Sequence, residues 1–159
     1  MKLKLLACFI ISVGVAIGVV AALGVANASG QVGKSGGVVD VNTAAEKDLL
    51  AMPHMTPAIV KGLIEKRPFA SITDLNAYLL SQKLTLEQMK AFYEKAFVPI
   101  KLNTATDAEI LLVPGVGKRM VHEFKEYRPW KTKEQFIKEI GKYVGAAEAE
   151  RLWRYVVID

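Results

Sequence analysis

The stretch LLVPGVGKRMV, residues 111–121, is the part of the sequence that decides the fold. A proline, two glycines around one apolar residue and two basic residues stand between two apolar runs. An earlier stretch, LAMPHMTPAIV at residues 50–60, has the same proline and the same apolar frame but lacks both glycines and both bases. The shared frame predicts one structure used twice. The differences indicate what the later copy does beyond folding.

The match between the two stretches continues without a gap over the sequence beyond residue 37, at an offset of 61 positions. The triplet NTA at residues 42–44 recurs at 103–105, and RPF at residues 67–69 corresponds to RPW at 128–130. An offset held over whole units predicts duplication of a supersecondary module. We call residues 38–99 the first half and residues 100–159 the second half.

Capping residues and prolines predict about four short helices in each half. Helix starts are expected where Ser or Thr is followed three residues later by an acid or an amide; these pairs are Thr43–Glu46, Ser71–Asp74, Thr85–Gln88, Thr104–Asp107 and Thr132–Gln135. The second helix of each half is expected over residues 57–66 and 118–127, since a proline follows each end. Gly145 is expected to end a helix before another at 146–156. No sustained alternation predicts a strand, so the expected fold class is all-α.

Four aromatic residues at matched positions are predicted to lie in the core rather than to stack on nucleic-acid bases. They are Phe69, Phe92, Trp130 and Trp153. Each half is too small to bury much apolar surface alone, so we expect the two halves to pack together.

The first 28 residues have the layout of an export signal. Two lysines are followed by an apolar run over residues 5–25 and by Ala26-Asn27-Ala28, a small-x-small cleavage site. The run is near the roughly 20 residues that span a bilayer, so an uncleaved membrane anchor is the alternative. Both interpretations place the rest of the chain outside the cytoplasm, in the periplasm or secreted. Residues 29–37, rich in glycine and serine, are predicted to be a flexible linker.

The residue types that serve catalysis and metal binding form no pattern in this sequence. The only cysteine, Cys8, lies in the export segment, so no disulfide or thiolate metal site is expected in the remainder. His54 and His122 stand at unmatched positions, and neither has a second ligand at metal-binding spacing. The acidic residues are spread at salt-bridge spacing. We therefore predict no enzyme, no cofactor and no metal.

The glycine turn at residues 114–119 has the chemistry of an anion site. Gly115 and Gly117 permit positive φ and close backbone approach. The helix expected after the turn leaves its first N–H groups without intrahelical acceptors, at the positive end of its dipole. Lys118 and Arg119 add positive charge there, which is unfavourable unless an anion is bound. These features predict a phosphate held by backbone amides and two side chains.

The stretch LLVPGVGKRMVHEF resembles a helix-hairpin-helix motif. Together with VNTA before it and the RPF-like turn after it, it resembles the ComEA-like periplasmic and competence DNA-binding proteins, over nearly the whole of each half. The resemblance implies two tandem helix-hairpin-helix units that bind double-stranded DNA by its phosphates, without sequence preference. By position, the contacts fall on the backbone amides of Gly115, Val116 and Gly117 and on Lys118 and Arg119.

The first half departs from the motif. His54 and Thr56 stand in place of the two glycines, and Pro57 and Ala58 stand in place of the two bases. Thr56 restricts close approach and disfavours positive φ, and Pro57 removes an amide. We therefore expect the first half to be a degenerate unit that keeps the fold and loses phosphate binding. Only the second half has the intact PGVGKR hairpin.

The distribution of charge weakly favours the second half as the DNA-binding half. The chain carries a formal net charge of +5; the first half has seven basic and seven acidic residues, and the second has eleven and nine. Eight further bases of the second half are candidates for a wider basic face: Lys125, Arg128, Lys131, Lys133, Lys138, Lys142, Arg151 and Arg154. Many nucleic-acid-binding proteins are far more basic.

A second resemblance gives an alternative function. MPHMTPAIVKGLIEKRPFASITDL in the first half is similar to PsbU, the extrinsic subunit of photosystem II, which has this fold without binding DNA. It implies an extracytoplasmic protein-interaction or structural module whose protein partner contacts the degenerate first half. A membrane would be contacted only through an uncleaved N-terminal segment.

Overall fold

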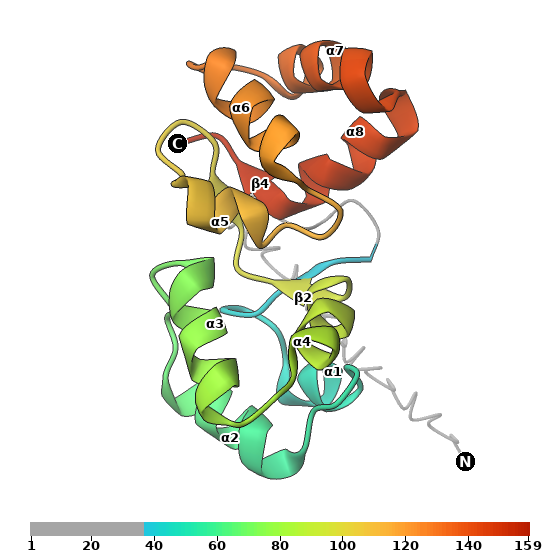
Figure 1. Ribbon diagram of the computed structural model, residues 1–159. Coiled ribbons are helices and arrows are strands. Elements are labelled where there is room, and N and C mark those ends of the chain that lie inside the picture. The colour runs from blue at the N-terminus through green and yellow to red at the C-terminus, as the bar shows by residue number, and fades with distance from the viewer. Residues whose placement is uncertain (1–36) are drawn as a thin grey trace, which may run out of the picture.

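The computed structural model describes residues 37–159, which form a mostly helical protein, as the sequence predicts (Figure 1). The predicted signal peptide or anchor, residues 1–28, lies outside the described residues, as does the linker except for Gly37. The first and second halves are stacked one above the other, with the strands near their junction (Figure 1).

The two halves have the same order of elements. The first half consists of β1 (Val39–Asp40), α1 (Glu46–Leu50), α2 (Pro57–Glu65), α3 (Ile72–Ser81), α4 (Leu86–Tyr93) and β2 (Ala96–Phe97). The second half consists of β3 (Ile100–Lys101), α5 (Asp107–Leu111), α6 (Lys118–Glu126), α7 (Lys133–Val144), α8 (Ala146–Leu152), the 3₁₀ turn η1 (Trp153–Tyr155) and β4 (Val156–Val157). The second helix of each half ends one residue earlier than predicted.

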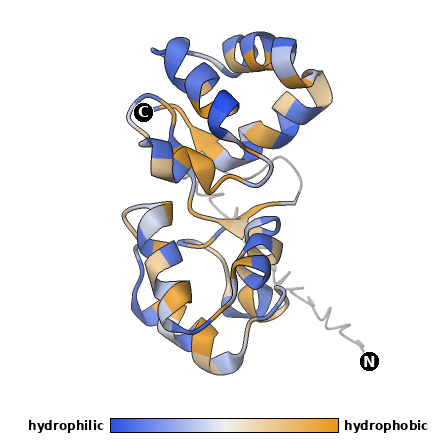
Figure 2. Cartoon of the chain, viewed as in Figure 1, coloured by the Kyte–Doolittle hydropathy of each residue, from blue (hydrophilic) through white to orange (hydrophobic). Residues whose placement is uncertain are grey.

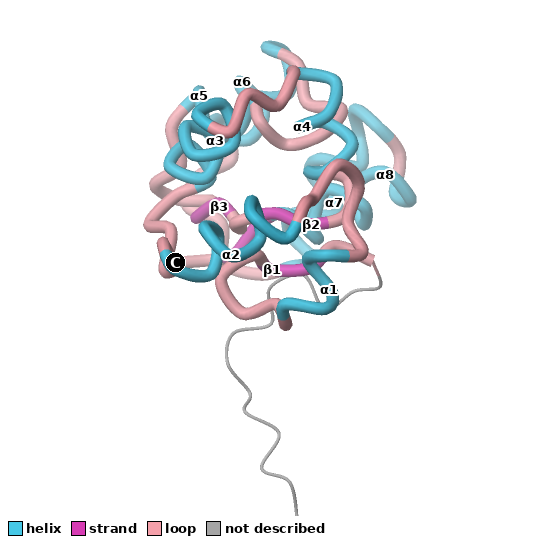
Figure 3. Tube along the Cα trace, turned by 90° about the horizontal axis from the view of Figure 1, so that it is seen from below, coloured by secondary structure: helices cyan, strands magenta, loops and turns pink. Residues whose placement is uncertain are grey.

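Short parallel strands, which the sequence did not predict, join the start of each half to its end. Val39 pairs with Ala96 in β1 and β2, and Ile100 pairs with Val156 in β3 and β4. Figure 3 shows that the strands lie centrally, with helices around them. Each strand has only two residues, too few to produce a visible alternation of apolar and polar positions. The helix predicted over residues 146–156 extends too far, because α8 ends at Leu152, the 3₁₀ turn η1 follows over Trp153–Tyr155, and Val156 begins β4.

Three of the five predicted helix caps are confirmed. Side-chain oxygens of Ser71, Thr85 and Thr132 accept hydrogen bonds from backbone N–H groups at the starts of α3, α4 and α7. The predicted caps at Thr43 and Thr104 are wrong, because both residues belong to turns closed by bonds to the carbonyls of Asp40 and Lys101. Helix α5 starts later, with a capping box made by Thr106 and Glu109, and α1 starts after Ala45 without a side-chain cap.

An asparagine fastens the RPF-like turn in each half. The Asn42 side chain accepts from the N–H of Phe69 at 2.8 Å and donates to its carbonyl at 3.0 Å. Asn103 forms the same pair with Trp130, at 2.6 and 3.1 Å. The two pairs of contacts occupy positions related by the 61-residue offset seen in the sequence. They fix the turn that follows α2 and the turn that follows α6.

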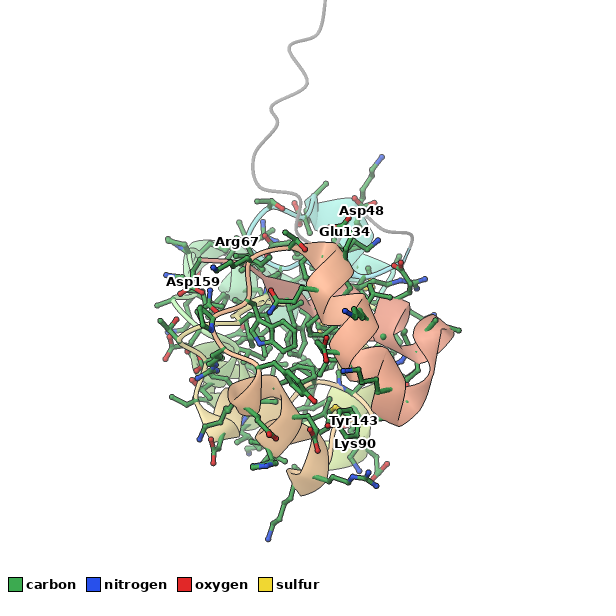
Figure 4. All side chains as sticks on the ribbon, turned by 90° about the horizontal axis from the view of Figure 1, so that it is seen from above. Asp48, Arg67, Lys90, Glu134, Tyr143 and Asp159 are labelled. Atoms are coloured by element: carbon green, nitrogen blue, oxygen red, sulfur yellow. The ribbon has the colours of Figure 1, made fainter. Side chains whose placement is uncertain are left out.

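Apolar side chains from both halves form one core. In Figure 2 the strands near the junction of the halves are coloured as hydrophobic. Side chains fill the space between the helices (Figure 4). The predicted core residues Phe69, Phe92 and Trp130 are buried, whereas Trp153 is half-buried and packs against Phe136 with ring centroids 5.4 Å apart. The halves meet where Phe97 and Tyr155 pack edge to face, at 5.1 Å.

Replacing Asn103 by alanine is expected to lower the free energy of unfolding by about 1–3 kcal/mol, because the Trp130 N–H and carbonyl lose their partner. Urea unfolding followed by circular dichroism measures this. Thr43→Ala, at an exposed turn position without a side-chain hydrogen bond, is the control. A loss for Asn103→Ala no larger than the control would contradict the fastening role.

Candidate nucleic-acid interface

The turn at residues 112–117 joins α5 to α6 and contains all three predicted backbone contacts. Gly115 has a φ of +83°, which favours glycine. Gly117 is the N-cap of α6 with φ −114° and ψ 176°, an extended conformation open to any residue. Of the two glycines, only Gly115 therefore has a backbone conformation that favours glycine. What distinguishes Gly117 is its missing side chain.

The matched turn of the first half follows nearly the same backbone course. His54, at the position of Gly115, has a φ of +62°, and Thr56, at the position of Gly117, is extended at φ −101°. The sequence analysis assumed that this position needs a positive φ, which Thr56 would oppose. That assumption is wrong, because φ is negative at both Thr56 and Gly117. The two turns differ in the atoms that they expose.

The start of α2 is closed and the start of α6 is open. The Thr56 hydroxyl accepts from the N–H of Ile59 at 3.3 Å, and Pro57 has no N–H to offer. No side chain caps α6, and its first backbone bond runs from the Val121 N–H to the Gly117 carbonyl at 3.1 Å. The N–H groups of residues 118–120 therefore have no acceptor among the described residues. A Cβ placed on Gly117 would meet nothing within 4 Å, so an anion has room to approach.

The predicted amide contact at Val116 is already occupied. The Val116 N–H donates to the Val113 carbonyl at 3.0 Å, and its side chain packs against the core. The predicted amides of Gly115 and Gly117 have no acceptor among the described residues, and the amides that begin α6, which include that of Met120, are open beside them. The α6 amides are open because every helix leaves its first N–H groups without intrahelical acceptors. The signal for this helix start in the sequence is Gly117, which is the N-cap of α6.

Both predicted basic side chains are exposed. Lys118 and Arg119 form no ion pair with a carboxylate among residues 37–159. The Arg119 guanidinium lies 5.7 Å from the ring centroid of Tyr143, close enough for a cation–π interaction. Sequence reasoning did not identify Tyr143, because it comes from α7. The open amides and two free positive charges thus meet at one helix start.

Half of the wider basic face is paired with carboxylates. Lys125 pairs with Asp107 at 2.7 Å, Lys133 pairs with Glu150 at 2.8 Å, Lys142 pairs with Glu139, and Arg151 pairs with Glu148. The other four bases keep their charge: Lys138 shares Glu139 with Lys142, Arg128 donates to the neutral Ala105 carbonyl, and Lys131 and Arg154 have no ion pair among residues 37–159. The start of α6 is the main candidate because it combines two unpaired charges with open backbone amides.

Arg151, on α8, which the sequence suggested only as part of a wider basic face, contacts the glycine turn. Its guanidinium donates to the Pro114 carbonyl at 2.6 Å and to both carboxylate oxygens of Glu148 at 2.6 and 2.8 Å. These bonds to Arg151 hold the pKa of the Glu148 carboxyl below its ordinary value. The sequence contains the Glu148–Arg151 spacing but gives no sign that α8 reaches the turn.

Other functional features are sparse in residues 37–159. Within this range no three His, Cys, Asp or Glu residues cluster to hold a metal ion, and none of its helices combines the length and apolar character that crossing a membrane requires. His54 is exposed, and the His122 ring nitrogen lies 3.1 Å from a Glu126 oxygen.

Comparisons of the chain with protein-family models, with curated proteins and with solved structures find no match.

Proposed function

We propose that this chain is an exported helix-hairpin-helix protein, ComEA-like, that binds duplex DNA through backbone phosphates without sequence preference. The observation that carries the proposal is the contrast between the two helix starts. At the start of α2, Thr56 caps the Ile59 N–H and Pro57 has no N–H. The start of α6 has no side-chain cap and carries Lys118 and Arg119. Folding alone does not require that difference.

The chemistry of the α6 start suits a phosphate diester. Its N–H groups and the positive end of the helix dipole attract an anion, and the absent Gly117 side chain allows direct hydrogen bonds. Lys118 and Arg119 add charge-assisted contacts. Such contacts position a duplex but carry no sequence information, and counterion release makes the affinity depend strongly on salt.

We further propose that the two halves are tandem copies of one unit. The matched element order, the paired asparagine contacts and the left-handed residues at 54 and 115 support this. In this proposal the first half is a degenerate unit with a structural role. The extracytoplasmic location, periplasmic or secreted, rests on the sequence of residues 1–28.

A protein-interaction or structural role, PsbU-like and without DNA, is the second candidate. The observation that favours it is the exposure of large apolar side chains on the first half: Leu50, Leu80 and Leu86. Leu86 is 67% exposed on α4. In this alternative a protein partner would contact the first half, and nuclease treatment would not release it.

Binding of purified protein to a fluorescent duplex of random sequence tests the proposal. At low salt we expect retention with a dissociation constant on the order of 10⁻⁶ to 10⁻⁴ M, as for non-specific binding, and a steep loss as salt rises. Lys118→Glu and Gly117→Val are each expected to weaken binding by about tenfold, since one removes a charge-assisted contact and the other blocks the amides.

Two outcomes would reject parts of the proposal. If wild-type protein shows no retention of duplex DNA at low salt, the DNA-binding proposal is rejected and the protein-interaction role becomes the better supported candidate. If both variants bind as well as wild type, the site is elsewhere. Lys47→Glu, which makes the same change of net charge at an exposed position of α1, controls for a simple change of net charge.

A further inference from the structure

We propose that Arg151 is a positioning residue that braces the glycine turn for phosphate binding. The inference rests on the proposed function of the α6 start. Its basis is a connection between two segments that are 37 residues apart in the sequence, the Arg151 guanidinium and the Pro114 carbonyl, joined at 2.6 Å. Arg151 ties the turn to α8 immediately before Gly115.

The Arg151 side chain is held by three residues, which are Pro114, Glu148 and Tyr155. Two bonds to Glu148 fix the guanidinium on α8, and its carbon Cζ lies 5.6 Å from the ring centroid of the buried Tyr155. A Cβ on Gly115 would come within 2.8 Å of an Arg151 terminal nitrogen, so the turn and the guanidinium are in close contact. A fixed donor on one side of the turn restricts its motion, which lowers the ordering cost of binding.

Arg151 is unsuited to bind the phosphate itself. Its positive charge is paired with Glu148, and its Nε and one terminal nitrogen donate to that carboxylate and to the Pro114 carbonyl. The Pro114 carbonyl oxygen would repel a phosphate, and the hydrogen bond from Arg151 occupies that oxygen. The role of Arg151 is therefore to hold the turn, and the contact to phosphate belongs to the start of α6.

The first half lacks this brace. Lys90 occupies the position matched to Arg151 and pairs with Glu87 at 3.3 Å, as Arg151 pairs with Glu148. No hydrogen bond connects Lys90 to the carbonyl of Pro53 among the described residues. The brace therefore occurs together with the open helix start and is absent where the helix start is closed.

Amide hydrogen exchange tests the brace without DNA. Arg151→Met keeps the length of the side chain and removes its charge and its donors. We expect exchange at the Val116 N–H, which bonds to Val113, to become about tenfold faster. The Met55 N–H, which forms the matched bond to Met52, is the internal control and is expected to remain unchanged. Unchanged exchange at Val116 would overturn the brace.

Binding to random duplex separates positioning from electrostatics. Arg151→Met is expected to lower affinity about three- to tenfold with an unchanged salt slope, since no phosphate contact is lost. Glu148→Gln removes a negative charge, which by charge alone would raise affinity. The brace predicts a fall, because Arg151 loses its anchor. The matched variant Glu150→Gln, also on α8, is expected to raise affinity slightly.

The outcomes distinguish this inference from the proposed function. A salt slope reduced by about 0.9 in Arg151→Met would mean that Arg151 contacts a phosphate directly, which overturns the positioning role. A rise in affinity for Glu148→Gln would overturn it too. If wild type binds no duplex but Val116 exchange accelerates in Arg151→Met, the brace stands and the DNA-binding proposal fails.

Discussion

Replacing Gly117, Lys118 and Arg119 by Thr, Pro and Ala is expected to lower duplex affinity at least about 100-fold at low salt. The three replacements are the residues that the first half carries at the matched positions. They close the amides with a capping hydroxyl and a proline and remove both free charges. Each charge-assisted contact contributes roughly 1.5–3 kcal/mol, so the loss of two accounts for this factor. The salt slope should fall by about 1.8.

The variant should fold, because α2 already starts with this sequence in nearly the same backbone conformation. Thr56 has φ −101° and ψ 158°, and Gly117 has φ −114° and ψ 176°. A new threonine cap should maintain or raise the free energy of unfolding. Fluorescence anisotropy with random duplex and urea unfolding measure the two effects. The reverse graft, Thr56→Gly, Pro57→Lys and Ala58→Arg, should strengthen binding. A forward graft that binds like wild type would place the site elsewhere.

Trp130→Ala is expected to lower the free energy of unfolding by about 3–5 kcal/mol, the cost of a large cavity in a core. The Trp130 side chain is 1% exposed, packs against Phe136 with ring centroids 5.2 Å apart, and donates its indole N–H to the Phe124 carbonyl at 2.8 Å. The variant removes this packing and leaves the carbonyl unpaired. Urea unfolding by circular dichroism gives the value.

Phe69→Ala is the matched variant in the first half and should cost a similar or smaller amount. Phe69 is slightly more exposed and its ring offers no hydrogen bond. If Trp130→Ala costs less than about 1.5 kcal/mol, the core around α6 is not packed as described. DNA binding measured where the variant is still folded should be weakened, because Trp130 supports α6 through Phe124.

Local signals made most helices predictable. Pro57 at the start of α2 and the Ser or Thr caps of α3, α4 and α7 act within one helical turn, so they can be read directly from the sequence. The helix caps predicted at Thr43 and Thr104 were wrong because the residue types that cap helices also stabilise turns. The strand pairs were missed because each strand has only two residues and because the paired strands are far apart in the sequence, as Val39 in β1 and Ala96 in β2 are.

The site was predictable where it depends on the helix start and unpredictable where it depends on tertiary contacts. The composition of residues 115–119 indicated open amides and free charge. The contact of Arg151 with Pro114 depends on how α8 packs, and the cation–π contact of Arg119 depends on α7. The left-handed conformation of His54 was also unexpected, since only the fold as a whole imposes it on a residue with a side chain.

The parallel strand pairs bring the chain into and out of each half at nearly the same place. β1 pairs with β2 and β3 with β4, so neither half needs a strand from the other to complete it. Only Val98 and Pro99 lie between β2 and β3. Each half is therefore closed by its own strand pair, and two residues are enough to connect one half to the other. A change on the surface of one half leaves the strand pair of the other half intact.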